Sequence, residues 1–468
     1  MGVDLLVINP PNSPFTSAGL LIEPIDVLTV ATWLKSIGYT VNVRDLDKEQ
    51  ILGRDFERIL IESNPRLIII PFDYHIPLYS TAAIKEVLEI VKISRAAGRK
   101  VIVGGRPATT NPALFLIDEG VVVVRGEMEL ALQEIVPLLL ADLDLSHISG
   151  IVIKSDCKVM FNEARKELLD LDRLPIPDRS LLPIERYIDV NTILSSRGCV
   201  ERCIFCPVPK FWGRWRRRSA QLVVDEITYL VREFGAKKIL FLDDHATVNS
   251  KRMREISRLL IKAKVKVALG CLGTVKCCDI ETLKWMREAG FAWIHYGCEF
   301  ADDKVLTSLQ KGITVEQIEK AIMLTRSQGI RVRTSWIFDS PGADSAGLER
   351  TCNLIVRTEP EEVRIHFMAV RGCSELFERL GKSDQLSNRE QYIHASSSHE
   401  NPFEITPELT MYWSMMLSQN LQRKGYRVVK HPEEWCDNEN QANSDRFVSF
   451  CPGRYGVGWE DHSRHEAS

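Results

Sequence analysis

Short β-branched runs alternate with helical segments along most of this 468-residue chain, and this alternation restricts its fold more than any other feature. Five such runs lie in the first 140 residues, and residues with helical spacing of apolar positions follow each of them. Continuous apolar runs between helices indicate strands buried on both faces of a parallel sheet. We therefore predict an α/β domain with a doubly wound, Rossmann-like sheet over residues 1–145. The runs are VDLLVIN (3–9), YTVNVRDL (39–46), RLIIIP (66–71), KVIVGG (100–105) and GVVVVRG (120–126).

The carboxyl ends of these strands are where a doubly wound sheet binds its ligands. Here the strand ends carry the segments NPPN, FDYH, GGRP and RGE. The first turn has no G-x-G-x-x-G pattern, so the sequence argues against an ordinary dinucleotide cofactor.

A second alternating series follows a hairpin (150–162) and a proline-rich linker, which together occupy residues 146–190. Its six βα units span residues 191–370, too few for a closed eight-stranded barrel, and predict a partial (β/α)6 barrel of the TIM type. Residues 371–468 are less regular: we expect one helix over 407–425 and a region that closes the substrate cleft, but no definite fold. The strands expected in the barrel are NTILSS, KKILFLDD, VKVALGC, AWIHYGCEF, IRVRTSWIF and EVRIHFMA.

Charge and hydropathy limit the partners and the compartment. The net charge of −3 comes from nearly balanced acids and bases, so neither nucleic acid nor an anionic membrane is expected as a partner. No apolar run approaches the roughly 18 residues that a spanning helix needs, and the N-terminus does not resemble a secretion signal. We expect a cytoplasmic protein whose twelve cysteines are thiols or metal ligands.

Cys199, Cys203 and Cys206 form a C-x3-C-x2-C pattern directly after the first strand expected in the barrel. Structural zinc usually takes its ligands from two separated pairs, and no second C-x2-C or H-x3-H pair follows. A 4Fe-4S cluster fits better. With three protein ligands, one iron would stay open to a substrate or cofactor. Three incidental buried cysteines are the alternative.

These residues resemble the radical S-adenosylmethionine (SAM) enzymes, whose cluster motif is C-x3-C-x2-C with an aromatic residue, here Phe205, before the last cysteine. The resemblance implies that SAM chelates the open iron and that its reductive cleavage yields a 5'-deoxyadenosyl radical. Over about residues 1–380 the chain is similar to the subfamily with an N-terminal cobalamin-binding domain. The segments that carry this similarity are VIVGGRPATTNP, VVVVRGEMELAL, SSRGCVERCIFCPVPKFWGRWRRRS, VVDEITYLVREFGAKKILFLDDHATVN and GCEFADDKVLTSLQKGITVEQI.

The resemblance also implies site residues at the strand ends. For SAM these are Phe205, Asp243, Glu299 and Ser335. Three of them have a structural alternative. Asp243 with Asp244 could instead cap the next helix, Glu299 could be a solvated strand-end acid, and Ser335 could be a buried, backbone-bonded serine. For cobalamin they are Asn9, His75, Gly104, Gly105, Gly126 and Glu127. The D-x-H-x-x-G motif that supplies an axial histidine is absent, so His75 could approach cobalt or be an ordinary loop residue.

Radical C-methylation of a small-molecule substrate is the function that the resemblance favours, with electrons from a flavodoxin- or ferredoxin-like donor. The segments FDSPG and RGCSE depart from the family pattern on the substrate side, which keeps open radical cyclisation, rearrangement or sulfur chemistry without methyl transfer. A third hypothesis is a noncatalytic zinc or cluster protein. The basic run GRWRRRS (213–219) is more typical of a solvated face than of a phosphate site. The adjacent Cys277 and Cys278 are typical of structural thiols.

Overall fold

The structure is a computed structural model. It describes residues 4–11, 23–72, 81–187, 190–366, 368, 371, 373–381, 407–429 and 446–450.

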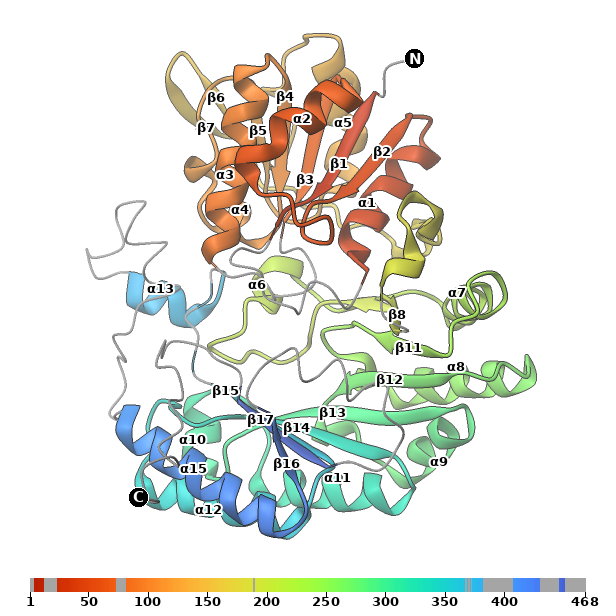
Figure 1. Cartoon of the computed structure of the whole chain (residues 1–468), viewed down its shortest axis with the longest axis vertical. Coiled ribbons are helices and arrows are strands. Elements are labelled where there is room, and N and C mark those ends of the chain that lie inside the picture. Colours follow the sequence, from red (N-terminus) through yellow and green to blue (C-terminus); the bar gives the residue numbers. More distant parts are fainter. Residues whose placement is uncertain are drawn as a thin grey trace, which may run out of the picture.

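The first sheet has seven strands in the order β2-β1-β3-β4-β5-β6-β7, and its first five are parallel, as expected for a doubly wound domain. Four of these five strands are buried along nearly their whole length because helices cover both faces of the sheet (Figure 1). The strands are β1 (Leu5–Asn9), β2 (Val41–Asp45), β3 (Leu67–Pro71), β4 (Lys100–Gly104) and β5 (Val121–Val124). The helices are α1 (Ile25–Ser36), α2 (Phe56–Ser63), α3 (Thr81–Ala96), α4 (Arg106–Thr110) and α5 (Glu129–Leu140).

The hairpin expected over 150–162 is present and continues this sheet. Strand β6 (Ile151–Ser155) pairs antiparallel with β5, and β7 (Lys158–Phe161) pairs antiparallel with β6. Over its described residues, 162–187, the linker that follows contains only short 3-10 turns, η4 (Leu171–Arg173), η5 (Arg179–Leu181) and η6 (Ile184–Arg186). Its prolines and charged residues explain why no longer element forms there.

The second sheet has eight strands in the order β16-β17-β15-β14-β13-β12-β11-β8, all parallel. Six of them are the strands expected for the partial barrel. The expected C-terminal helix is also present as α15 (Pro407–Arg423). The sequence did not predict β16 and β17, which extend the sheet beyond β15. The strands are β8 (Val190–Ile193), β11 (Lys238–Phe241), β12 (Ala268–Gly273), β13 (Phe291–Glu299), β14 (Arg331–Ile337), β15 (Glu362–His366), β16 (Arg427–Val429) and β17 (Phe447–Phe450).

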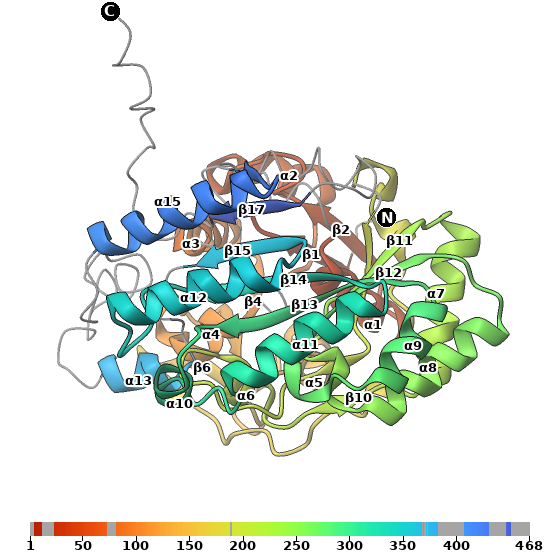
Figure 2. The ribbon, with the colours of Figure 1, turned by 90° about the horizontal axis from the view of Figure 1, so that it is seen from below.

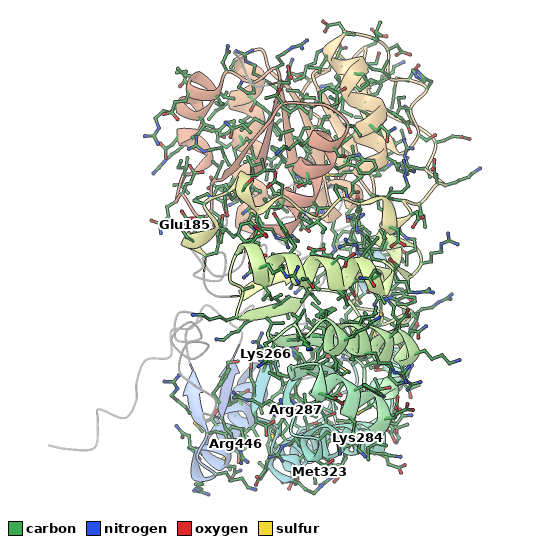
Figure 3. All side chains as sticks on the ribbon, turned by 90° about the vertical axis from the view of Figure 1, so that its right-hand side faces the viewer. Glu185, Lys266, Lys284, Arg287, Met323 and Arg446 are labelled. Carbon is green, nitrogen blue, oxygen red and sulfur yellow. The ribbon has the colours of Figure 1, made fainter. Side chains whose placement is uncertain are left out.

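The two faces of the second sheet differ. Alternate residues of β13, such as Ile294, Tyr296 and Cys298, are buried in a core under the outer helices. The residues between them are only partly buried and line a face turned toward the first domain (Figures 1 and 2). On the far side, Lys284 and Arg287 of α9 and Met323 of α11 are exposed (Figure 3). We call the face turned toward the first domain the open face. The outer helices are α7 (Ala220–Glu233), α8 (Ser250–Lys262), α9 (Ile280–Glu288), α10 (Asp303–Ser308), α11 (Val315–Ser327) and α12 (Ser345–Thr358).

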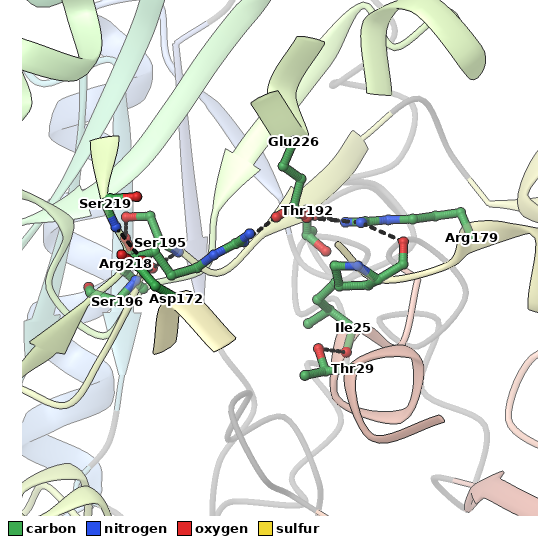
Figure 4. A network of polar contacts seen from close by, with 12 residues as sticks. Ile25, Thr29, Asp172, Arg179, Thr192, Ser195, Ser196, Arg218, Ser219 and Glu226 are labelled. Atoms are coloured by element: carbon green, nitrogen blue, oxygen red, sulfur yellow. Dashed lines mark hydrogen bonds and ion pairs between the residues drawn. The ribbon is translucent and has the colours of Figure 1, made fainter. Parts of the chain in front are cut away.

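A buried polar network joins the linker to both domains (Figure 4). The guanidinium of Arg179, which is 0% exposed, donates to Glu226 of α7 (2.9 Å) and to the backbone carbonyl of Thr192 in β8 (2.5 Å). Glu23 of the first domain in turn accepts from the backbone N–H of Thr192 (2.6 Å). These partners come from three parts of the chain, so the network links the linker, the start of the barrel sheet and the first domain.

Replacing Tyr187 by phenylalanine tests the anchoring of the linker. The Tyr187 hydroxyl donates to the buried carboxylate of Asp45 at 2.6 Å. Its loss leaves this carboxylate less well satisfied, so we expect the free energy of unfolding to fall by about 1–3 kcal/mol, measured by urea denaturation. Tyr229→Phe is the control because that ring packs on Phe234 at the surface of the barrel. Equal stability of Tyr187→Phe and the native chain would contradict the anchoring role.

Candidate functional site

The cysteine loop begins after β8 and is anchored on several sides. A short strand β9 (Ser196–Arg197) pairs with β10 (Arg216–Arg217). Gly198 then turns the chain with φ +86°, where a Cβ atom would lie 2.8 Å from the carbonyl oxygen of Arg214. Farther along the loop, the Ile204 N–H donates to Leu309 (3.1 Å), and the Ile204 carbonyl accepts from the N–H of Leu376 (2.7 Å). These backbone contacts set the positions of the three thiols.

The three thiols of this loop are free and mostly covered by protein. Burial raises the pKa of Cys199 to about 11 and that of Cys206 to about 12, and it also raises the pKa of Cys203. Thiolates are therefore costly here unless a metal stabilises them. Among the residues that the structure describes, no three His, Cys, Asp or Glu side chains converge on a single ion position. An iron-sulfur cluster does not need its ligands to converge on one ion, because each thiolate binds a different iron. The three thiols of this loop therefore fit such a cluster.

The cysteine loop lies at the junction of the two domains. Cys199 and Cys206 pack against the core of the first domain. So do Val208, Phe211 and Trp212 of the short helix α6 (Val208–Trp212), which directly follows the last cysteine. Phe205 packs on the core of the barrel instead. A cluster held by this loop would therefore lie between the carboxyl ends of the two sheets.

Asp243 and Asp244, directly after β11, accept hydrogen bonds from the backbone at the start of the cysteine loop. The buried Asp243 carboxylate accepts from the backbone N–H groups of Ser195 (2.6 Å) and Ser196 (2.7 Å), and from the Ser195 hydroxyl (2.5 Å). Asp244 accepts from the backbone N–H of Gly198 (3.1 Å). The polar contacts of Asp243 are thus made with the protein itself, which indicates a positioning role.

Glu299, at the end of β13, points into the site because of two irregularities. The pairing of β13 with β14 shifts register between Gly297 and Glu299, and Glu299 has φ +64°, a rare conformation for a residue with a side chain. Its carboxylate forms an ion pair of 2.5 Å with Lys311. Although burial would lower the pKa of Lys311, Glu299 and Cys203 hold it above its usual value. Gly297 provides the space, since a Cβ there would lie 2.6 Å from Glu299 Oε1.

Ser335 of β14 lies between two imidazoles. Its hydroxyl is 2.7 Å from Nε2 of His295 in β13 and 3.1 Å from Nε2 of His366 in β15. Burial and the neighbouring arginines lower the pKa of His366 to about 4, and the same causes place that of His295 well below its usual value. Both imidazoles are therefore neutral at neutral pH.

Two of the residues expected to bind cobalamin use their side chains within the protein. Asn9 donates from its amide to Asp45 at 2.7 Å. Glu127 accepts from both Arg216 and Leu169 N–H, and lies 3.8 Å from Arg197. The Asn9 contact joins β1 to β2 within the first domain, whereas the Glu127 contacts tie this domain to the linker and to β9 and β10.

The glycines expected at the cobalamin site have different surroundings. A Cβ at Gly104 would meet the thioether of Met128 at 2.4 Å, and one at Gly105 would meet the Phe72 carbonyl oxygen at 1.7 Å. Packing within the protein therefore accounts for a glycine at each of these two positions. Gly126 has φ +79° and open space beside it, since a Cβ at this position would have its nearest neighbour 4.0 Å away. Its backbone therefore suits close approach of a ligand at the strand ends. His75 lies outside the described residues.

Sequence reasoning missed four side chains that surround the site: Lys311, His245, His295 and His366. Nδ1 of His245 lies 3.6 Å from the Cys199 sulfur, and burial lowers the pKa of this imidazole to about 4. Its place directly after the Asp243-Asp244 strand end was a signal that could have identified it. Lys311 lies in the loop between α10 and α11, where no local pattern points to a site.

Comparison with known proteins identifies both domains. The model of the radical SAM superfamily matches residues 193–355, and that of the B12 binding domain matches residues 14–136. An uncharacterized methyltransferase of Pyrococcus horikoshii is 28% identical over 357 residues, 74% of this chain and 76% of that relative. The anaerobic magnesium-protoporphyrin IX monomethyl ester cyclase of Rubrivivax gelatinosus is 29% identical over 284 residues, 58% of this chain and 51% of that protein.

A solved structure shares this two-domain fold. The radical S-adenosylmethionine methyltransferase TsrM from Kitasatospora setae, with cobalamin and a 4Fe-4S cluster bound, superposes with a TM-score of 0.71. The match covers 82% of this chain and 78% of that one, at 19% sequence identity. At this identity the likeness shows the fold.

Proposed function

Because this chain belongs to the radical SAM enzymes that carry a B12 binding domain, we propose that it transfers a methyl group to a carbon atom of a small-molecule substrate. Its cofactors are a 4Fe-4S cluster, S-adenosylmethionine and cobalamin. The observation that carries the proposal is the position of the cysteine loop, which packs against the core of the B12 binding domain while its strand belongs to the barrel. A cluster held by this loop would then lie at the ligand-binding edge of the first sheet.

When bound, the cluster and SAM supply a 5'-deoxyadenosyl radical, and cobalamin supplies the methyl group. The chain's own residues position these groups and exclude water. Cys199, Cys203 and Cys206 would hold the cluster, and the carboxylates of Asp243 and Asp244 keep their loop in place. Radical chemistry of this kind needs reactants at short distances more than it needs a side chain acting as acid or base.

Glu299 is our proposed contact for the amino or ribose groups of SAM, with Phe205 beside the cluster. An ionised carboxylate suits ammonium and hydroxyl donors. The support is its irregular backbone, which turns the carboxylate into the site, and its ion pair of 2.5 Å with Lys311, whose charge in turn acts to lower the pKa of Cys203 against the effect of burial. Ser335 is a further contact in this proposal, supported by its place on the open face. For cobalamin, Gly126 has the most suitable surroundings of the described residues named above.

The products formed from SAM test the function. We expect anaerobically reconstituted protein with reductant to release 5'-deoxyadenosine, and to release S-adenosylhomocysteine only when cobalamin is added. Mass spectrometry of the adenosyl products, with and without cobalamin, provides the measurement. Cobalamin-dependent S-adenosylhomocysteine supports methyl transfer, because one SAM molecule must recharge the methyl carrier for each turnover.

Radical cyclisation is the second candidate, and the cyclase of Rubrivivax gelatinosus is the relative that favours it. In that case 5'-deoxyadenosine forms but S-adenosylhomocysteine does not, whether or not cobalamin is present. This result would overturn methyl transfer and leave the radical step intact.

The source of electrons and the compartment complete the proposal. A flavodoxin- or ferredoxin-like protein is our proposed electron donor, and the cytoplasm our proposed compartment. None of the described helices is long and apolar enough to cross a membrane.

A further inference from the structure

His245 is a buried imidazole beside the cysteine loop that the proposed cofactor contacts do not include. It follows Asp243 and Asp244 directly in the chain and is 3% exposed. Its Nδ1 atom lies 3.6 Å from the sulfur of Cys199, a separation that suits a hydrogen bond to an atom as large as sulfur. The imidazole therefore faces one of the three thiolates that would hold the cluster.

Contacts on either side of Cys199 fix this separation. Before it, the backbone N–H of Gly198 donates to the carboxylate of Asp244 (3.1 Å). After it, the backbone N–H of Glu201 donates to the Cys199 sulfur itself (3.4 Å). Asp244 and His245 are neighbours in the chain, so the segment that presents the imidazole also positions the thiol.

The second ring nitrogen of His245 indicates where the imidazole carries its proton. Nε2 is fully covered, and no described residue offers it a hydrogen-bond partner. A neutral imidazole has a single N–H group, and a buried N–H without a partner is costly. A thiolate bound to iron can only accept a hydrogen bond. The proton is therefore favoured on Nδ1, where it points at the Cys199 sulfur.

We propose that His245 donates a hydrogen bond from Nδ1 to the Cys199 sulfur of the 4Fe-4S cluster and thereby makes the cluster easier to reduce. The electron that the protein donor supplies adds one negative charge to the cluster, and a hydrogen-bond donor at a ligand sulfur stabilises the more negative form. The effect is larger in a covered site, where water does not compete for the sulfur. This inference rests on the cluster and not on methyl transfer, because the reductive cleavage of SAM begins with this reduction.

The midpoint potential of the cluster tests the proposal. Leucine and asparagine are nearly equal in size, but only the asparagine amide can donate a hydrogen bond close to the position of Nδ1. We expect His245→Leu to shift the reduction equilibrium about tenfold toward the oxidised cluster, a potential about 59 mV lower for one electron. His245→Asn should recover part of this shift. Redox titration followed by electron paramagnetic resonance gives each potential, in the reconstituted full-length protein without SAM or cobalamin.

Thr247→Val is the matched control. Thr247 is 5% exposed and its hydroxyl accepts from the backbone N–H of Thr274 (3.2 Å), so the change removes a buried polar group from the same segment. We expect the native potential and the native iron content. The native potential in His245→Leu would overturn the proposal. Equal shifts in His245→Leu and His245→Asn, or an equal shift in Thr247→Val, would also overturn it, because the cause would then be packing.

A measurement on the native chain decides the question if His245→Leu does not retain iron. Histidine that carries a heavy nitrogen isotope is incorporated, and the reduced cluster is studied by electron nuclear double resonance. We expect the spin of the cluster to couple to an imidazole nitrogen in the native protein but not in His245→Asn. No coupling in the native protein, or the same coupling in His245→Asn, would overturn the proposal.

The adenosyl products separate this inference from the proposed function. A lowered potential in His245→Leu, together with a native chain that releases no S-adenosylhomocysteine, would support the hydrogen bond and reject methyl transfer. Cobalamin-dependent S-adenosylhomocysteine together with equal potentials would reject the hydrogen bond alone. A native chain that takes up no iron would reject both.

Discussion

Replacing Cys203 by alanine is expected to reduce the iron content of the reconstituted protein from about four atoms per chain toward zero and to abolish the formation of 5'-deoxyadenosine. Cys203 is the most buried of the three cysteines in the loop, and the thiolate it would supply cannot be replaced by water in a covered site. Iron assay, the absorbance of the cluster and mass spectrometry of adenosyl products give three independent readouts. A variant that keeps its cluster and its activity would end the assignment of this loop.

Cys352→Ala is the control for the loss of a buried thiol. Cys352 is 5% exposed, against 8% for Cys203, but it lies on α12 with its sulfur 3.9 Å from the backbone carbonyl oxygen of Trp413. Its replacement removes a similar side chain far from the loop, so we expect full iron content and activity. Loss of iron in both variants would instead point to general misfolding.

Replacing Glu299 by glutamine is expected to lower the affinity for SAM by about 10- to 100-fold, since a charge-assisted hydrogen bond contributes roughly 1.5–3 kcal/mol. Glutamine keeps the size of the side chain but removes the charge. The change also leaves Lys311 without its carboxylate partner in a covered site. The Kd for SAM, measured in the reconstituted protein, and the rate of 5'-deoxyadenosine formation check the expectation.

The double variant Glu299→Gln with Lys311→Met separates ligand binding from stability. It removes both charges, so the cost of an unpaired lysine disappears and the thermal midpoint should return toward the native value. SAM affinity should stay low if the Glu299 carboxylate contacts SAM. Recovery of affinity in the double variant would show that Glu299 acts only through Lys311. Glu319→Gln, which breaks an ion pair on the outer helices, is the control and should bind SAM normally.

Much of the fold was predictable because its strands are locally distinctive. Runs such as VVVV in β5 are apolar at every position, as expected for strands covered on both faces. Strands β16 and β17 were missed because they are short and lie in a polar segment, where pairing with β15 rather than local pattern makes them strands.

The candidate site, like the fold, was only partly predictable from the sequence. The three cysteines could be identified from their spacing and from their place after a strand. The contacts of Asp243 and Ser335 could not, because their partners are Ser195, in the connection after β8, and His295 and His366, on neighbouring strands. Glu299 was recognised as a strand-end acid, but its orientation depends on a register shift and a positive φ that no sequence pattern signals.

The sequence by itself determined the two α/β units, their order and the thiols that open the second one, because these follow from short-range periodicity and spacing. Only the tertiary structure decided that the cysteine loop lies against the first domain, that Lys311 pairs with Glu299, and that the His245 imidazole faces the Cys199 sulfur. The physical reason is that charge pairing and burial depend on distances between segments far apart in the chain, and packing alone sets those distances.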